Sequence, residues 1–98
     1  MVSLEFESFE SEEFILYQNR PNPFTSQTQV QFYMPFETEA NLKVYDASGK
    51  VLFEKNERYS KGLQTIQVEL NNLTTGGMLY YQLETADFVA TRKMIVLK

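Results

Sequence analysis

Three residue types are missing from this chain of 98 residues: cysteine, histidine and tryptophan. Without cysteine, no disulfide holds the fold, and the compartment cannot be inferred from thiols. Without histidine as well, a zinc site lacks its usual ligands, and the commonest general base and the Ser-His and Cys-His nucleophile pairs are absent. A pair of carboxylates is the one glycosidase-like alternative, and a chain this short offers little cleft to hold it. The sequence therefore predicts a protein that is not an enzyme and that binds no metal or cofactor.

Long apolar runs and a clustered basic face are also missing. No segment approaches the ~20 apolar residues of a membrane-spanning helix. The net charge is −4, and without a basic cluster we expect no nucleic-acid partner. Residues 1–13 contain no basic residue and hold five carboxylates, on Glu5, Glu7, Glu10, Glu12 and Glu13. We interpret residues 1–13 as an acidic linker or extension and residues 14–98 as one domain.

Apolar and polar residues alternate along most of the chain, and this period of two predicts β-strands. The predicted strands cover residues 14–17, 29–34, 41–45, 51–58, 66–71, 79–84 and 88–97. Because each amphipathic sheet must bury one face, these strands predict an all-β antiparallel sandwich. The side chains expected to point inward are Leu16, Phe24, Val30, Phe32, Leu42, Val44, Phe53, Ile66, Val68, Leu70, Leu79, Tyr81 and Leu83.

The breaks between these strands carry turn residues. Asp46-Ala47-Ser48-Gly49 has Asp at a turn start and Gly where a positive φ is needed, as in a tight hairpin. Arg20-Pro21-Asn22-Pro23-Phe24 is the most distinctive stretch, because each proline fixes its own φ and favours an extended residue before it. Two amide donors are missing there, so the segment cannot lie in a central strand. We interpret it as a rigid corner with Phe24 closing one end of the sandwich; a binding motif is the alternative.

Further features follow one another in order along residues 14–98. The first is Leu16-Tyr17-Gln18-Asn19-Arg20-Pro21-Asn22-Pro23-Phe24 with Thr28, and the next is Leu42-Lys43-Val44-Tyr45-Asp46 with Gly49 and Val51. Then come Lys61-Gly62, Leu73-Thr74-Thr75-Gly76-Gly77, Tyr80-Tyr81-Gln82-Leu83 and Lys93-Met94-Ile95-Val96-Leu97-Lys98. In this order they resemble C-terminal sorting domains, of the A type, of the type IX secretion system of Gram-negative bacteria.

The resemblance implies an immunoglobulin-like sandwich at the end of a longer protein. Such a protein enters the periplasm by an N-terminal signal, and the outer-membrane translocon recognises the folded domain. A sortase-like cell-surface peptidase then commonly removes the domain and attaches the passenger to a lipopolysaccharide anchor at the cell surface. This chain opens without a basic region or an apolar signal segment. We therefore expect a fused upstream passenger, a Met1 supplied for expression and cleavage within residues 1–13.

The resemblance also implies which residues carry the address. A translocon that handles many passengers must recognise something common to their tails, and the last strand is the obvious candidate; the alternative is that its residues only complete a sheet. The expected recognition residues are Pro21, Asn22, Pro23, Phe24, Asp46, Gly49, Gly77, Tyr80, Lys93, Met94, Ile95, Val96, Leu97 and Lys98.

Two other functions remain open from the residues. One is an immunoglobulin-like adhesion or spacer module of a surface protein. The other is a carbohydrate-binding module in which Tyr33, Tyr45 and Tyr80 replace tryptophan, although exposed strand tyrosines are more often cross-strand packing partners. In the extension, apolar residues alternate with polar ones from Val2 to Phe6, so a sheet edge of a second copy could recruit it and cause weak self-association.

Overall fold

The computed structural model describes residues 13–71, 73 and 76–97. The predicted extension up to residue 12, its self-association and Lys98 lie outside these residues. Within the described part there are seven strands and no helix, hence no helix that could span a membrane. The strands are β1 (Ile15–Leu16), β2 (Gln27–Met34), β3 (Thr38–Tyr45), β4 (Val51–Tyr59), β5 (Gly62–Glu69), β6 (Gly77–Glu84) and β7 (Val89–Val96).

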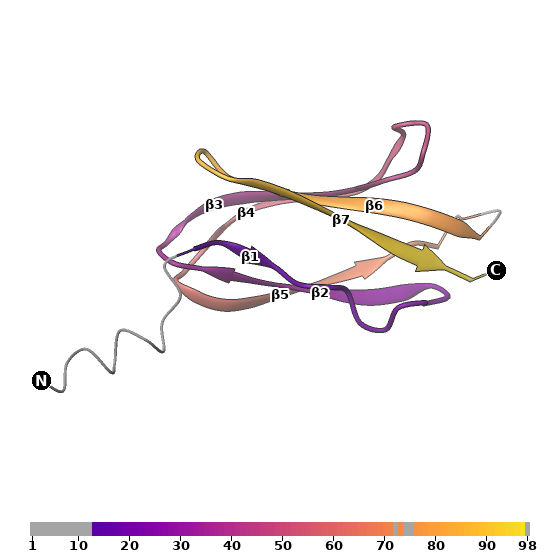
Figure 1. Cartoon of the computed structure of the whole chain (residues 1–98), viewed down its shortest axis with the longest axis horizontal. Helices are drawn as coiled ribbons and strands as arrows, with labels where there is room; N and C mark the ends of the chain where they lie inside the picture. The colour runs from indigo at the N-terminus through magenta and orange to yellow at the C-terminus, as the bar shows by residue number, and fades with distance from the viewer. Residues whose placement is uncertain (1–12, 72, 74–75, 98) are drawn as a thin grey trace, which may run out of the picture.

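The strands form two antiparallel sheets that face each other (Figure 1). The smaller sheet has the order β1-β2-β5, and the larger has the order β4-β3-β6-β7. The predicted immunoglobulin-like antiparallel sandwich is confirmed, with a strand at each predicted place. The fifth strand begins at Gly62, ahead of its predicted start at residue 66, because Gly62 and Leu63 pair with Met34 and Tyr33 of β2.

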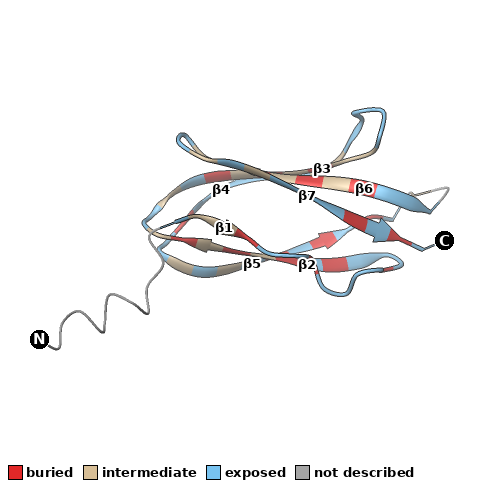
Figure 2. Ribbon diagram, viewed as in Figure 1, coloured by how far each residue is buried: buried red, intermediate tan, exposed pale blue. Residues whose placement is uncertain are grey.

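The core lies between the two sheets and follows the alternation read from the sequence (Figure 2). Every side chain that we expected to point inward is buried except Phe53, which is half-buried and packs against the core. Phe53 lies on β4, one of the two edge strands of the larger sheet. The smaller sheet has one strand fewer, so β4 meets few partners across the sandwich. Its position at an edge therefore explains its partial burial.

Among the residues that the structure describes, five buried apolar residues were absent from the predicted set. They are Met34, Ala40, Tyr59, Met94 and Val96. Tyr59 closes β4 after a charged stretch, and its ring packs edge-on against Phe32 with centroids 5.1 Å apart. The sequence around Tyr59 is too polar to predict a core position, and only the contact with Phe32 reveals one.

A buried polar network joins the two sheets near the start of the chain. The hydroxyl of Tyr81, on β6, donates to the carbonyl of Tyr17 at 2.7 Å and accepts from the amide of Asn19 at 2.9 Å. The amide side chain of Asn19 donates to Thr28 Oγ1 at 3.0 Å and to the carbonyl of Pro21 at 3.1 Å. Thr28 also donates to the Pro21 carbonyl, at 2.8 Å. Burial raises the pKa of Tyr81, so this hydroxyl stays protonated and can serve both partners.

The first prediction concerns the Tyr81 hydroxyl. Tyr81→Phe should lower the free energy of unfolding by about 1–3 kcal/mol, because the buried amide of Asn19 loses its acceptor. Tyr59→Phe is the matched control, since the buried Tyr59 hydroxyl has no hydrogen-bond partner among the described residues. Urea unfolding of both variants measures the difference. Equal stabilities would contradict a role for the network.

The second prediction concerns Phe24, which is only 2% exposed. Phe24→Ala should destabilise the domain by roughly 3–5 kcal/mol. In a domain of this size ~1 kcal/mol shifts the Tm by about 4–8 °C, so the variant should be marginal or unfolded. Phe36→Ala makes the same change at a ring that is 51% exposed and should have a much smaller effect. A Phe24→Ala variant that melts within a few degrees of the parent would contradict this packing.

Candidate recognition site

The proline corner lies against the last strand. The amide of Phe24 donates to the carbonyl of Ile95 at 3.0 Å, and the amide of Leu97 donates to the carbonyl of Phe24 at 2.7 Å. Phe24 and Val96 thereby form a parallel bridge. Both proline peptide bonds of the corner, before Pro21 and Pro23, are cis. The two segments that the sequence singled out separately are therefore parts of one structure.

Side chains from residues 18–22 also form hydrogen bonds along the edge of β7. The Oδ1 atom of Asn22 accepts from the amide of Ile95 at 2.9 Å. The amide side chain of Gln18 donates to the carbonyl of Lys93 at 2.7 Å. In the opposite direction, the guanidinium of Arg92 donates to the carbonyl of Leu16 at 2.6 Å. From Lys93 to Leu97, the outer edge of β7 therefore already has hydrogen-bond partners.

Three residues of this arrangement were not predicted as site residues: Gln18, Asn19 and Arg92. Gln18 and Asn19 lie inside the segment that carries the resemblance, shortly before the prolines. This position in the sequence could have identified them as site residues. Arg92 gave no signal, because its partner is a backbone carbonyl 76 positions away.

The apolar run at the end of the chain divides between two environments. Met94 and Val96 are buried in the core, whereas Ile95 is 39% exposed and Leu97 is 52% exposed. Lys93 is exposed on the same face as Ile95, because side chains on a strand alternate between faces. Packing therefore accounts for Met94 and Val96, and leaves Lys93, Ile95 and Leu97 available to a partner.

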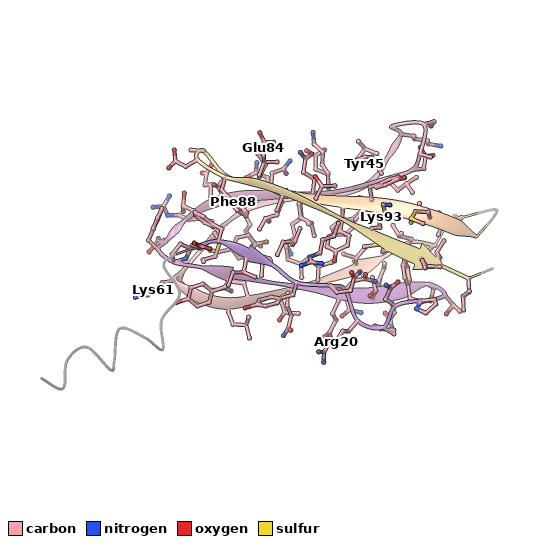
Figure 3. All side chains as sticks on the ribbon, viewed as in Figure 1. Arg20, Tyr45, Lys61, Glu84, Phe88 and Lys93 are labelled. Carbon is pink, nitrogen blue, oxygen red and sulfur yellow. The ribbon has the colours of Figure 1, made fainter. Side chains whose placement is uncertain are left out.

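Gly77 and Tyr80 lie on β6, next to this strand. Gly77 begins β6 opposite Val96, with a φ of 136° that favours glycine. Tyr80 pairs with Lys93 on one side and with Tyr45 on the other. The rings of Tyr45 and Tyr80 stack with centroids 5.7 Å apart. Figure 3 shows Tyr45 and Lys93 on the larger sheet, and Arg20 pointing away from the far side of the smaller sheet.

The tyrosines considered for a sugar site do not form one platform. Tyr45 and Tyr80 are cross-strand partners on the larger sheet, whereas Tyr33 lies on β2 of the smaller sheet. Among the described residues, no three acidic side chains come close enough to hold a metal ion.

The predicted site residues Asp46 and Gly49 build the hairpin turn between β3 and β4. One carboxylate oxygen of Asp46 accepts from the Ser48 hydroxyl at 2.6 Å and from the amides of Ser48 and Lys50 at 2.9 and 3.0 Å. The Ser48 hydroxyl, followed by the Lys50 amide, lowers the pKa of Asp46. Gly49 has a φ of 93°. These contacts give Asp46 and Gly49 a structural role, separate from the corner.

The comparisons with known proteins bear on this arrangement of corner and last strand. The family model for the secretion system C-terminal sorting domain matches residues 20–97, which include the proline corner and β7. No curated protein matches the chain. Since the match covers most of the sequence, the chain belongs to the family of type IX secretion system C-terminal sorting domains.

Proposed function

We propose that this domain carries a fused upstream passenger from the periplasm through the type IX outer-membrane translocon. The family itself indicates a sorting signal for export to the cell surface or the extracellular space. The observation that supports the finer proposal is the joining of the corner to the last strand, through Phe24 and Asn22. This joining makes the readable end of β7 available only in the folded domain. A translocon that recognises it would select folded tails.

We further propose that a sortase-like peptidase removes the domain by cleavage within residues 1–13. The ring of Phe14 stacks on Phe88, with centroids 4.9 Å apart, and packs edge-on against Phe36 at 5.4 Å. Phe14 is thus held in the folded domain immediately after the acidic segment. Cleavage before Phe14 would leave the sandwich intact and release the passenger.

The third prediction tests whether the end of the chain is recognised for export. A short polar tail added after Lys98 should leave the sandwich folded, because β7 ends at Val96. The same tail should stop export of a fused passenger and trap it in the periplasm. The measurement is the surface and periplasmic passenger in a bacterium with type IX secretion, together with the Tm of the purified domain.

The matched control inserts the same polar peptide between Ala86 and Asp87, in the β6–β7 turn at the opposite end of the sandwich (Figure 1). Export should continue with this insertion. Normal surface delivery of a stably folded, tail-extended fusion would show that the chain end is not read. Periplasmic retention of both insertions would instead indicate a general intolerance of insertions.

A further inference from the structure

The arrangement of β7 restricts how a partner can contact it. An edge strand recruits another strand through its free backbone groups. At the C-terminal end of β7 those groups are engaged: Gln18 binds the Lys93 carbonyl, Asn22 and Phe24 bind Ile95, and the Phe24 carbonyl accepts from Leu97. A partner that added a strand at this edge would first have to displace the corner and Phe24 from the core. The outward side chains of β7 are therefore the part that a partner can contact directly.

These outward side chains belong to a patch on the outer face of the larger sheet. Ile95 pairs with Met78 of β6, and Tyr80 pairs with both Lys93 and Tyr45. Met78 is 43% exposed, close to the 39% of Ile95. We define the terminal-strand patch as Tyr45, Met78, Tyr80, Lys93 and Ile95. Val51 continues it next to Tyr45, and Leu97 follows Ile95 along the chain.

Apolar side chains gather here more than elsewhere on the described surface. Eight large apolar side chains are exposed, and four of them lie in or beside the terminal-strand patch: Val51, Met78, Ile95 and Leu97. Contiguous exposed apolar surface on a small domain marks a site of protein contact. Interfaces of this kind are enriched in tyrosine and methionine at their centre.

Lys93 is the one charged side chain of the terminal-strand patch, and it is exposed. Beside the patch, charges of opposite sign offset each other: Lys43 lies opposite Glu54, and Asp46, whose pKa is lowered by the hydrogen bonds of its turn, is ionised next to Tyr45. A complementary partner therefore has an apolar contact surface with a carboxylate placed to meet Lys93.

We propose that a protein component of the export machinery, with an apolar surface that presents a carboxylate to Lys93, docks on the terminal-strand patch through side chains and without strand addition to the C-terminal end of β7. This inference rests on the proposed sorting function and names the surface that is read. It explains how the last strand can be recognised although the outer backbone groups from the Lys93 carbonyl to the Leu97 amide are engaged by Gln18 and the corner. It also assigns recognition to Met78, which no motif in the sequence indicated.

The test uses a passenger fused to the whole domain in a bacterium with type IX secretion. The double variant Met78→Thr/Ile95→Thr keeps residues suited to strands and removes the apolar centre of the patch. Surface delivery should fall at least about tenfold, the effect of ~1.4 kcal/mol of lost binding. The matched control is Tyr33→Thr/Leu63→Thr, a cross-strand pair of a half-buried tyrosine and an exposed leucine on the outer face of the smaller sheet, and its delivery should be unchanged.

A charge reversal provides a second readout. Lys93→Glu should reduce surface delivery, whereas Lys93→Arg should preserve it, because only the first reverses the sign that the partner meets. Lys93 is exposed, so neither change should alter the Tm, which is measured for every variant. If the double variant unfolds, the comparison of Lys93→Glu with Lys93→Arg alone tests the docking proposal.

The failures of the two proposals differ. If the unsubstituted fusion reaches the surface equally in a strain without the translocon, the proposed function is wrong. If it needs the translocon and the folded patch variants are delivered normally, only the docking proposal is overturned. A concentration-dependent dimer of the purified domain that Met78→Thr/Ile95→Thr dissociates would also overturn it, since the patch would then be a contact between two copies.

Discussion

The attachment of the proline corner to the last strand is the contact on which the rest of this domain depends. Phe24 closes the core from one side, and the backbone around it pairs with Ile95 and Leu97. The buried network of Asn19, Thr28 and Tyr81 fixes the same corner from within. Since the chain has no cysteine, these contacts tie its first segment to its last strand where a disulfide would serve in other small domains.

This attachment connects stability with recognition. A domain of about 100 residues has a stability of only about 5–15 kcal/mol, so loss of one buried ring in the corner removes a large part of it. Loss of export in a corner variant would then report unfolding before it reported lost recognition. The outward side chains of β6 and β7 are different, because their exposure lets them change without loss of the core. Recognition can therefore be tested by substitutions on β6 and β7 that leave the domain folded.

The fold could be read from the sequence because strand alternation is a local property. Residues such as Val30, Phe32, Leu42 and Val44 repeat with a period of two, and each of them is buried in the structure. The Asp46 to Gly49 turn was readable for the same reason, since its hydrogen bonds join residues at most four apart. The predictions were incomplete where burial depends on distant strands, as for Tyr59 against Phe32 and for Phe53 at an edge.

The sequence by itself determined the all-β class, the turns, the core face of most strands and the resemblance to sorting domains, because all of these follow from neighbouring residues and their order. Only the tertiary structure decided that the corner and β7 are one unit, since their hydrogen bonds join residues about 73 positions apart. It also divided the last apolar run into buried Met94 and Val96 and exposed Ile95 and Leu97. A continuous apolar run does not alternate, so the sequence leaves open which of its residues meet the opposite sheet, and packing of the two sheets settles it.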